Sequence, residues 1–147
     1  VVVKKDSGIK TLADLKDKTV VTQADSAALD VLSDEEGQKA VADTFKELQT
    51  LPDYNNAFLQ LEAETVDAVA CDLSIAAYQM SANPDVYVQL EEPLSSEHYA
   101  VGFKKGDDAL AAKVTETLKE MYNDGTIEEL VKKYESYGLS LDNWVLK

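Results

Sequence analysis

The chain contains the short apolar run Thr65-Val66-Asp67-Ala68-Val69-Ala70-Cys71-Asp72, which ends in a carboxylate. The run predicts a buried strand over residues 66–71, followed directly by a helix over residues 73–81. In open α/β sheets, ligands bind beyond the carboxyl ends of parallel strands. An acid at that position can pair with a cation, such as the ammonium group of a small solute. Asp72 is therefore the first candidate for a ligand-binding residue.

Strands and helices are expected to alternate on both sides of this run. Short β-branched stretches predict strands at residues 1–5, 19–23, 45–51 and 86–90. Apolar periodicity and capping residues predict helices at residues 27–33, 38–43 and 56–63. This order predicts βαβ units, so the expected fold class is α/β with a mostly parallel sheet.

The pattern changes near residues 92–98, where a new structural unit is expected to begin. Beyond that point the sequence predicts one strand, at residues 99–104, and two helices, at residues 109–122 and 127–134.

The composition excludes several classes of function. The chain has 147 residues, 28 acidic and 14 basic, and a net charge of −14. Such a charge disfavours binding to nucleic acid or to an anionic membrane, because both need clustered cations. All the basic residues are lysine, so the chain has no guanidinium group for bidentate recognition of a carboxylate.

The chain also lacks the side chains of a metal or disulfide site. Cys71 is the only cysteine and His98 is the only histidine. A disulfide within the chain is excluded, and a metal site built from histidine and cysteine is not expected. No cofactor is expected either.

The opening of the sequence is typical of an excised fragment. The chain contains no signal sequence, and Val1-Val2-Val3-Lys4-Lys5 already lie inside an expected strand. No stretch approaches the roughly 20 apolar residues that a membrane-spanning helix needs.

Several segments together resemble the bacterial extracytoplasmic solute-binding proteins (family 3 type) of polar amino-acid ABC transporters. The match depends on the order and spacing of these segments across nearly the whole chain. They are Ile9-Lys10-Thr11-Leu12-Ala13-Asp14-Leu15-Lys16, residues 19–32, Val66-Asp67-Ala68-Val69 with Asp72, Tyr99-Ala100-Val101-Gly102-Phe103-Lys104-Lys105-Gly106-Asp107, and Asp124-Gly125-Thr126-Ile127.

The resemblance implies two α/β lobes of the periplasmic-binding-protein type (type II), which are joined by two crossover strands and close over one amino acid. By this resemblance, residues 1–96 form the second ligand-binding lobe, including a crossover strand. Residues 97–147 form the return crossover strand and C-terminal helices that belong to an incomplete first lobe. The absent part of the first lobe would supply an arginine for the ligand carboxylate and the walls of the side-chain pocket.

The resemblance also implies the site residues. The acid after the Val66–Val69 strand, here Asp72, binds the α-ammonium group of the ligand. The alternative reading is that Asp72 only caps the helix that begins at Leu73. At the helix start after residues 19–23, Ser26 and the backbone of Ala27 would receive the ligand carboxylate.

Three positions depart from the family pattern. Asp25 and Glu64 stand where the family commonly has glycine, and Ala27 stands where it commonly has a second hydroxyl residue. Asp25 is expected to be the N-cap of the following helix, where its charge would repel a ligand carboxylate. Four outcomes stay open: Asp25 is a plain cap and the backbone amides bind the carboxylate normally, Asp25 turns away, the ligand is more cationic or lacks a carboxylate, or the affinity is weak.

The expected function is the substrate-binding component of an ABC importer, which captures a polar amino acid outside the cytoplasm and delivers it to a permease. No enzymatic activity is expected. One alternative is an enzyme of the same fold, dehydratase-like, with Asp25 and Asp72 as an acid–base pair. Another is the ligand-sensing domain of a receptor. The exposed apolar helices of the fragment also predict self-association, as a homodimer or by a swap of the C-terminal segment.

Overall fold

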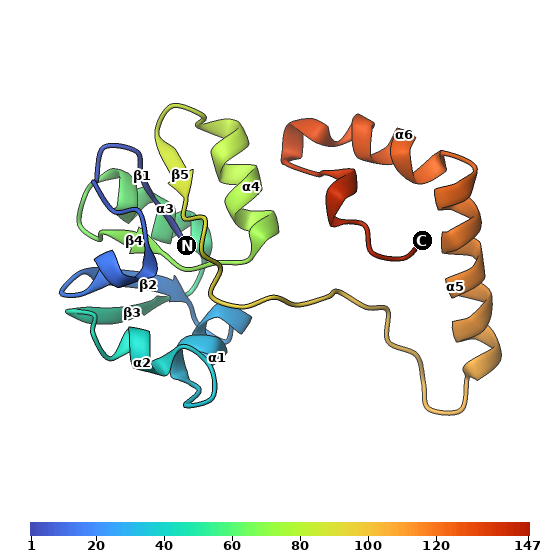
Figure 1. Cartoon of the computed structure of the whole chain (residues 1–147), viewed down its shortest axis with the longest axis horizontal. Coiled ribbons are helices and arrows are strands. Elements are labelled where there is room, and N and C mark those ends of the chain that lie inside the picture. The colour runs from blue at the N-terminus through green and yellow to red at the C-terminus, as the bar shows by residue number, and fades with distance from the viewer. The chain divides into compact units, whose positions relative to one another are not determined.

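The first unit, Val1–Ser96, is built around a five-stranded sheet in the computed structural model, which describes residues 1–147. The strands are β1 (Val2–Lys4), β2 (Thr19–Gln23), β3 (Glu47–Leu51), β4 (Ala68–Val69) and β5 (Tyr87–Gln89). Their order in the sheet is β3-β2-β4-β1-β5 (Figure 1). The fold is thus of the α/β class, as the sequence predicts.

The prediction of a mostly parallel sheet is wrong, because the sheet is mixed. β2 pairs in parallel with β3 and β4, whereas β1 pairs antiparallel with both β4 and β5. The four strands that are connected through α-helices, β2 to β5, all run in one direction, as the strands of βαβ units do. β1 is not joined to β2 through such a unit, because only the 3-10 helix Leu12–Leu15 lies between them, and it runs in the opposite direction.

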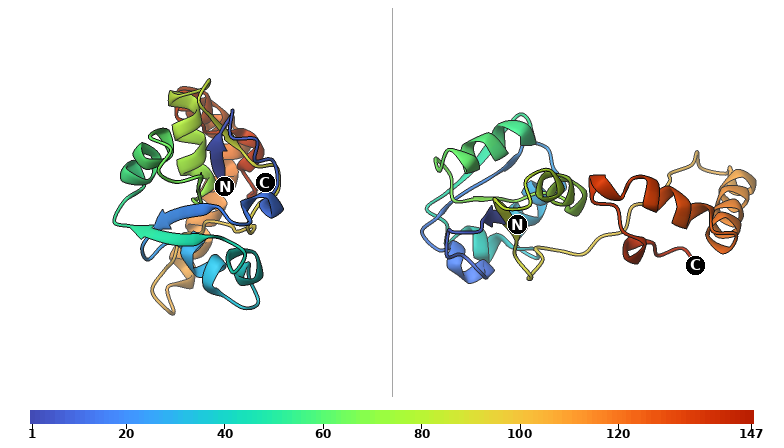
Figure 2. Two further views of the ribbon diagram at one scale, coloured as in Figure 1. Left: turned by 90° about the vertical axis from the view of Figure 1, so that its left-hand side faces the viewer. Right: turned by 90° about the horizontal axis from the view of Figure 1, so that it is seen from above.

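Two layers of helices cover the two faces of this sheet. One layer contains α1 (Ala27–Ser33) and α2 (Lys39–Ala42), and the other contains α3 (Tyr54–Glu62) and α4 (Leu73–Ala82). Figure 2 shows the sheet between the two layers. Side chains alternate between them: Val20 belongs to the core under α1, and Val21 to the core under α3. This alternation is why the short apolar strands are buried on both faces.

The second unit, Glu97–Lys147, is a pair of helices with a short tail. α5 (Asp108–Asn123) packs on α6 (Thr126–Lys133), and Gly125 makes the turn between them with a φ of +87°. Two 3-10 helices follow, Glu135–Tyr137 and Leu141–Asn143. Ile127 is the only buried apolar residue of this unit. The unit therefore buries little apolar surface by itself.

The predicted strand at residues 99–104 is absent, because this segment has no paired neighbour and no regular secondary structure. None of the helices is both long and apolar enough to span a membrane.

Candidate functional site

Two helices, one on each face of the sheet, begin at its carboxyl edge. β2 leads into α1, whose N-cap is Ser26, and β4 leads toward α4, whose N-cap is Asp72. β2 and β4 are neighbouring parallel strands, with Val21 opposite Val69. Their carboxyl ends therefore meet at one edge, which brings Ser26 and Asp72 to the same side of the lobe.

The side chain of Thr22 links the segments that lead into these two helices. Its side chain is fully buried, and Oγ1 donates a hydrogen bond to the carbonyl oxygen of Ala70 at 2.8 Å. Oγ1 of Thr22 also lies 3.3 Å from Oγ of Ser26. Thr22 thus holds the end of the β4 segment against the start of α1. Thr22 was not among the predicted site residues, although a hydroxyl residue inside a short β-branched strand is visible in the sequence.

Ser26 is the N-cap of α1, so the prediction that Asp25 caps this helix is wrong. Oγ of Ser26 accepts a hydrogen bond from the amide of Leu29 at 3.2 Å and donates one to the carbonyl oxygen of Gln23 at 2.7 Å. Asp25 has a φ of +55°, is exposed, and makes no hydrogen bond or ion pair. This left-handed conformation places Asp25 in the turn before the helix.

The first turn of α1 leaves backbone donors without a protein acceptor. The amides of Ala27 and Ala28 donate no hydrogen bond within the chain, as is usual for the first positions of a helix. Ala27 is exposed. A ligand carboxylate could therefore accept hydrogen bonds from this turn without displacing any existing bond.

The carboxylate of Asp72 has no partner in the protein. Asp72 occupies the N-cap position of α4, but its side chain makes no capping hydrogen bond. It also forms no ion pair, and the residue is partly buried. The alternative reading, in which Asp72 only caps α4, lacks the hydrogen bond that it requires. The carboxylate is thus available to a cation from outside the chain.

Cys71, next to Asp72, is a free and partly buried thiol. Burial raises the pKa of this thiol to about 12, so it stays protonated at neutral pH and is a poor nucleophile. No group of His, Cys, Asp and Glu side chains is arranged to hold a metal ion.

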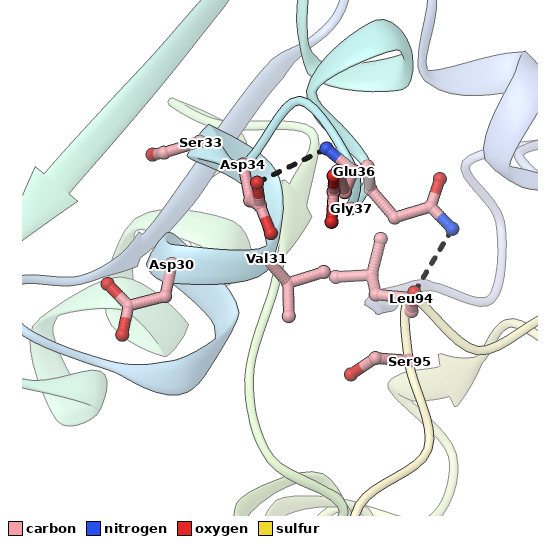
Figure 3. A pocket seen from close by; sticks show the side chains of 9 residues that line it. Asp30, Val31, Ser33, Asp34, Glu36, Gly37, Leu94 and Ser95 are labelled. Atoms are coloured by element: carbon pink, nitrogen blue, oxygen red, sulfur yellow. Dashed lines mark hydrogen bonds between the residues drawn. The ribbon is translucent and has the colours of Figure 1, made fainter.

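A pocket of about 620 Å³ lies elsewhere on the first unit, at the C-terminal end of α1 (Figure 3). Three carboxylates contribute to its wall, and Gln38 Nε2 donates a 3.1 Å hydrogen bond to the carbonyl oxygen of Leu94 beside it. Its lining residues are Asp30, Val31, Ser33, Asp34, Glu36, Gly37, Gln38, Leu94 and Ser95. None of the predicted site residues lines this pocket.

Residues 1–137 match the family of bacterial extracellular solute-binding proteins, family 3. The chain is 29% identical over 136 residues to the arginine-binding extracellular protein ArtP of Bacillus subtilis (strain 168), covering 91% of this chain and 51% of the relative. It is 35% identical over 81 residues to the glutamine-binding protein GlnH of an ABC transporter of the same organism, and this match covers 55% of this chain and 29% of the relative. The chain thus spans about half, or less, of the length of these relatives.

Solved structures show the same likeness. A histidine-bound substrate-binding protein of an ABC uptake transporter from Streptococcus pneumoniae superposes with a TM-score of 0.74 at 28% identity, covering 95% of this chain and 58% of that one. An ancestral arginine-binding protein bound to arginine gives a TM-score of 0.70 at 34% identity, and the match covers 90% of this chain and 57% of that one.

Proposed function

The chain belongs to the bacterial extracellular solute-binding proteins, family 3, and on this premise we propose that it is one lobe of an amino-acid-binding protein that serves an ABC importer. The relatives named for arginine and glutamine and the histidine-bound structure support a polar amino acid as the ligand. Membership of a solute-binding family favours reversible binding over the enzymatic alternative. The permease partner and the extracytoplasmic location are part of the same proposal.

The main support for the proposed site is the unpaired carboxylate of Asp72. A carboxylate and an ammonium group form a charge-assisted hydrogen bond, which is about twice as strong as a neutral one. Asp72 has neither a capping bond nor an ion pair to give up when it binds such a group. In the proposed complex, Asp72 therefore receives the α-ammonium group of the amino acid.

The first turn of α1 is the proposed site for the ligand carboxylate. The free amides of Ala27 and Ala28 are its donors. The hydroxyl proton of Ser26 is already directed to the carbonyl oxygen of Gln23, so Ser26 mainly holds this turn in place. Asp25 lies in the preceding turn with its charge exposed. It would weaken carboxylate binding unless the ligand brings a further positive charge.

We further assign residues 1–96 to the second lobe and residues 97–147 to a return segment and helices that complete a first lobe. The coverage of the solved structures, 57% and 58%, supports this assignment. A ligand that contacts only one lobe remains exposed to water. A second lobe that closed over it would lower the local dielectric constant and strengthen the bond to Asp72.

Calorimetry tests the proposal on the longer, two-lobe polypeptide that it requires. We expect one or more of arginine, glutamine, glutamate and histidine to bind. Asp72→Asn removes the charge while keeping the shape, and it should weaken binding roughly 10- to 100-fold. The matched control is Asp85→Asn, which makes the same charge change at an exposed residue beyond the other end of α4. Unchanged affinity in Asp72→Asn, or equal losses in both variants, would contradict the proposed site.

A further inference from the structure

Charged side chains are distributed unequally between the two edges of the sheet in the first unit. β2, β3, β4 and β5 run in one direction, so their carboxyl ends all lie at one edge. An acidic residue follows each of these strands within three positions. These residues are Asp25 after β2, Asp53 after β3, Asp72 after β4, and Glu91 and Glu92 after β5. The edge that carries the proposed site is therefore acidic from β3 to β5.

The lysines lie at the opposite edge. Lys18 directly precedes β2, Lys46 directly precedes β3, and Lys4 ends β1, which runs antiparallel to the other strands. No lysine follows β2, β3 or β4 before the next helix begins, and none follows β5 as far as Ser96. None of the acids at the carboxyl edge forms an ion pair. The negative charge at the proposed site is thus not balanced by a lysine of this unit.

We propose that this edge selects an amino acid with a net positive charge, and that Asp25 sets the preference. The inference rests on the proposed function, because it narrows the ligand of that same site from polar to cationic amino acids. Asp72 binds the α-ammonium group that all these ligands share, so it does not distinguish one from another. Asp25 does, because it lies beside the proposed site of the ligand carboxylate.

Asp25 leaves a neutral amino acid with an unbalanced repulsion. In the proposed complex, the α-ammonium group pairs with Asp72 and the carboxylate lies at the first turn of α1. Asp25 comes one residue before the N-cap of that helix and is exposed, so its charge repels the carboxylate of every amino acid. A cationic group on the ligand side chain offsets this repulsion, because Asp25 attracts it. A neutral amino acid has no such group, and an acidic one adds a second repulsion.

The order of the strands keeps these charges within range of one another. β2 lies between β3 and β4, so Asp25 lies between Asp53 and Asp72 along the edge. Neighbouring strands are about 4.8 Å apart, so the three strand ends span roughly 10 Å. This span is comparable to the Debye length, about 8 Å at physiological ionic strength. The fields of the three carboxylates therefore add at the site.

Calorimetry on the longer, two-lobe polypeptide tests the inference with arginine and citrulline. Citrulline has the shape of arginine, but a neutral urea group replaces the guanidinium group. We expect arginine to bind at least about tenfold more tightly, and Asp25→Asn to reduce this preference roughly threefold or more. Asparagine adopts the left-handed backbone of Asp25 as aspartate does, so the variant changes the charge alone. The matched control is Asp85→Asn, just before β5 at the opposite edge, which should leave the preference unchanged.

A salt series adds a readout that a purely structural role of Asp25 would not change. The preference for arginine should fall as the ionic strength rises from about 0.01 M to about 1 M, because salt screens the charges at the edge. Asp25→Asn should show a smaller fall, because it has lost one of these charges. Equal salt dependence in the two proteins would contradict the role of Asp25.

The outcomes separate this inference from the proposed function. Binding of amino acids without a preference for arginine over citrulline would overturn the inference and leave the proposed function standing. An undiminished preference in Asp25→Asn, or tighter binding of glutamine or glutamate than of arginine, would do the same. No binding of any amino acid would overturn both.

Discussion

The substitution Thr22→Val should destabilise the first unit by removing one buried hydrogen bond without creating a cavity. Thr22 is fully buried, and its hydroxyl donates to the carbonyl oxygen of Ala70 at 2.8 Å. Valine has nearly the same shape, so the change leaves that carbonyl oxygen without its donor and removes the 3.3 Å contact of the hydroxyl with Oγ of Ser26. Leaving a buried polar group unsatisfied costs about 1–3 kcal/mol. Burial of the new methyl group offsets up to about 0.8 kcal/mol of this cost.

The expected loss in the free energy of unfolding is therefore about 1–2 kcal/mol, measured by urea denaturation. Thr19→Val is the matched control on the same strand, because Thr19 is also buried but its hydroxyl makes no hydrogen bond. That control should change the free energy of unfolding by less than about 0.5 kcal/mol. Equal stability of Thr22→Val and the unmodified chain, or equal losses in the two variants, would refute the role of this hydrogen bond.

The remaining predictions concern the caps, a strained turn and the thiol. Ser26→Ala should lower the free energy of unfolding by about 1 kcal/mol, since it removes the capping hydrogen bond of α1. Asp72→Asn should change it by less than about 0.5 kcal/mol, because Asp72 makes no such bond to α4. Urea denaturation measures both variants, and equal losses would contradict the difference between the two caps. Glu64→Gly and Glu64→Ala both remove the ion pair between Glu64 and Lys4, but only glycine adopts the φ of +58° at this position without strain. Glu64→Gly should therefore be more stable than Glu64→Ala by about 1 kcal/mol, whereas Glu62→Gly inside α3 should destabilise the chain. Equal stability of the two Glu64 variants would contradict this. The pKa of the Cys71 thiol rises from 9.0 to about 12 on folding, so the folded state holds a proton that the unfolded state loses, and stability should fall as the pH rises through this window. Cys71→Ala should lack that part of the fall, and rapid reaction of Cys71 with a thiol reagent at pH 8 in the folded chain would contradict the prediction.

The sequence predicted the helices of the first unit well because their signals are local. α1 was expected at residues 27–33 and is Ala27–Ser33, and α4 was expected at residues 73–81 and is Leu73–Ala82. Apolar periodicity and capping residues determine these elements within one stretch of chain. The same local patterns carry no information on the direction of β1, because that depends on its pairing with β4 and β5.

The candidate site was predicted only in part, for a similar reason. Asp25 and Ser26 are both good N-cap residues, and only the backbone conformation shows that Asp25 lies in the turn at a φ of +55°. The role of Thr22 depends on Ala70, which is distant in sequence. The strand at residues 99–104 was predicted from its local sequence, but a strand forms only where another backbone pairs with it.

We propose that the carboxylate of Asp72 receives the α-ammonium group of an amino acid. Calorimetry on the two-lobe polypeptide can compare an amino acid that binds with the same compound lacking its α-amino group. The unmodified protein should strongly prefer the complete amino acid, and Asp72→Asn should lose most of this preference. Equal discrimination by the two proteins would show that the ammonium group binds elsewhere.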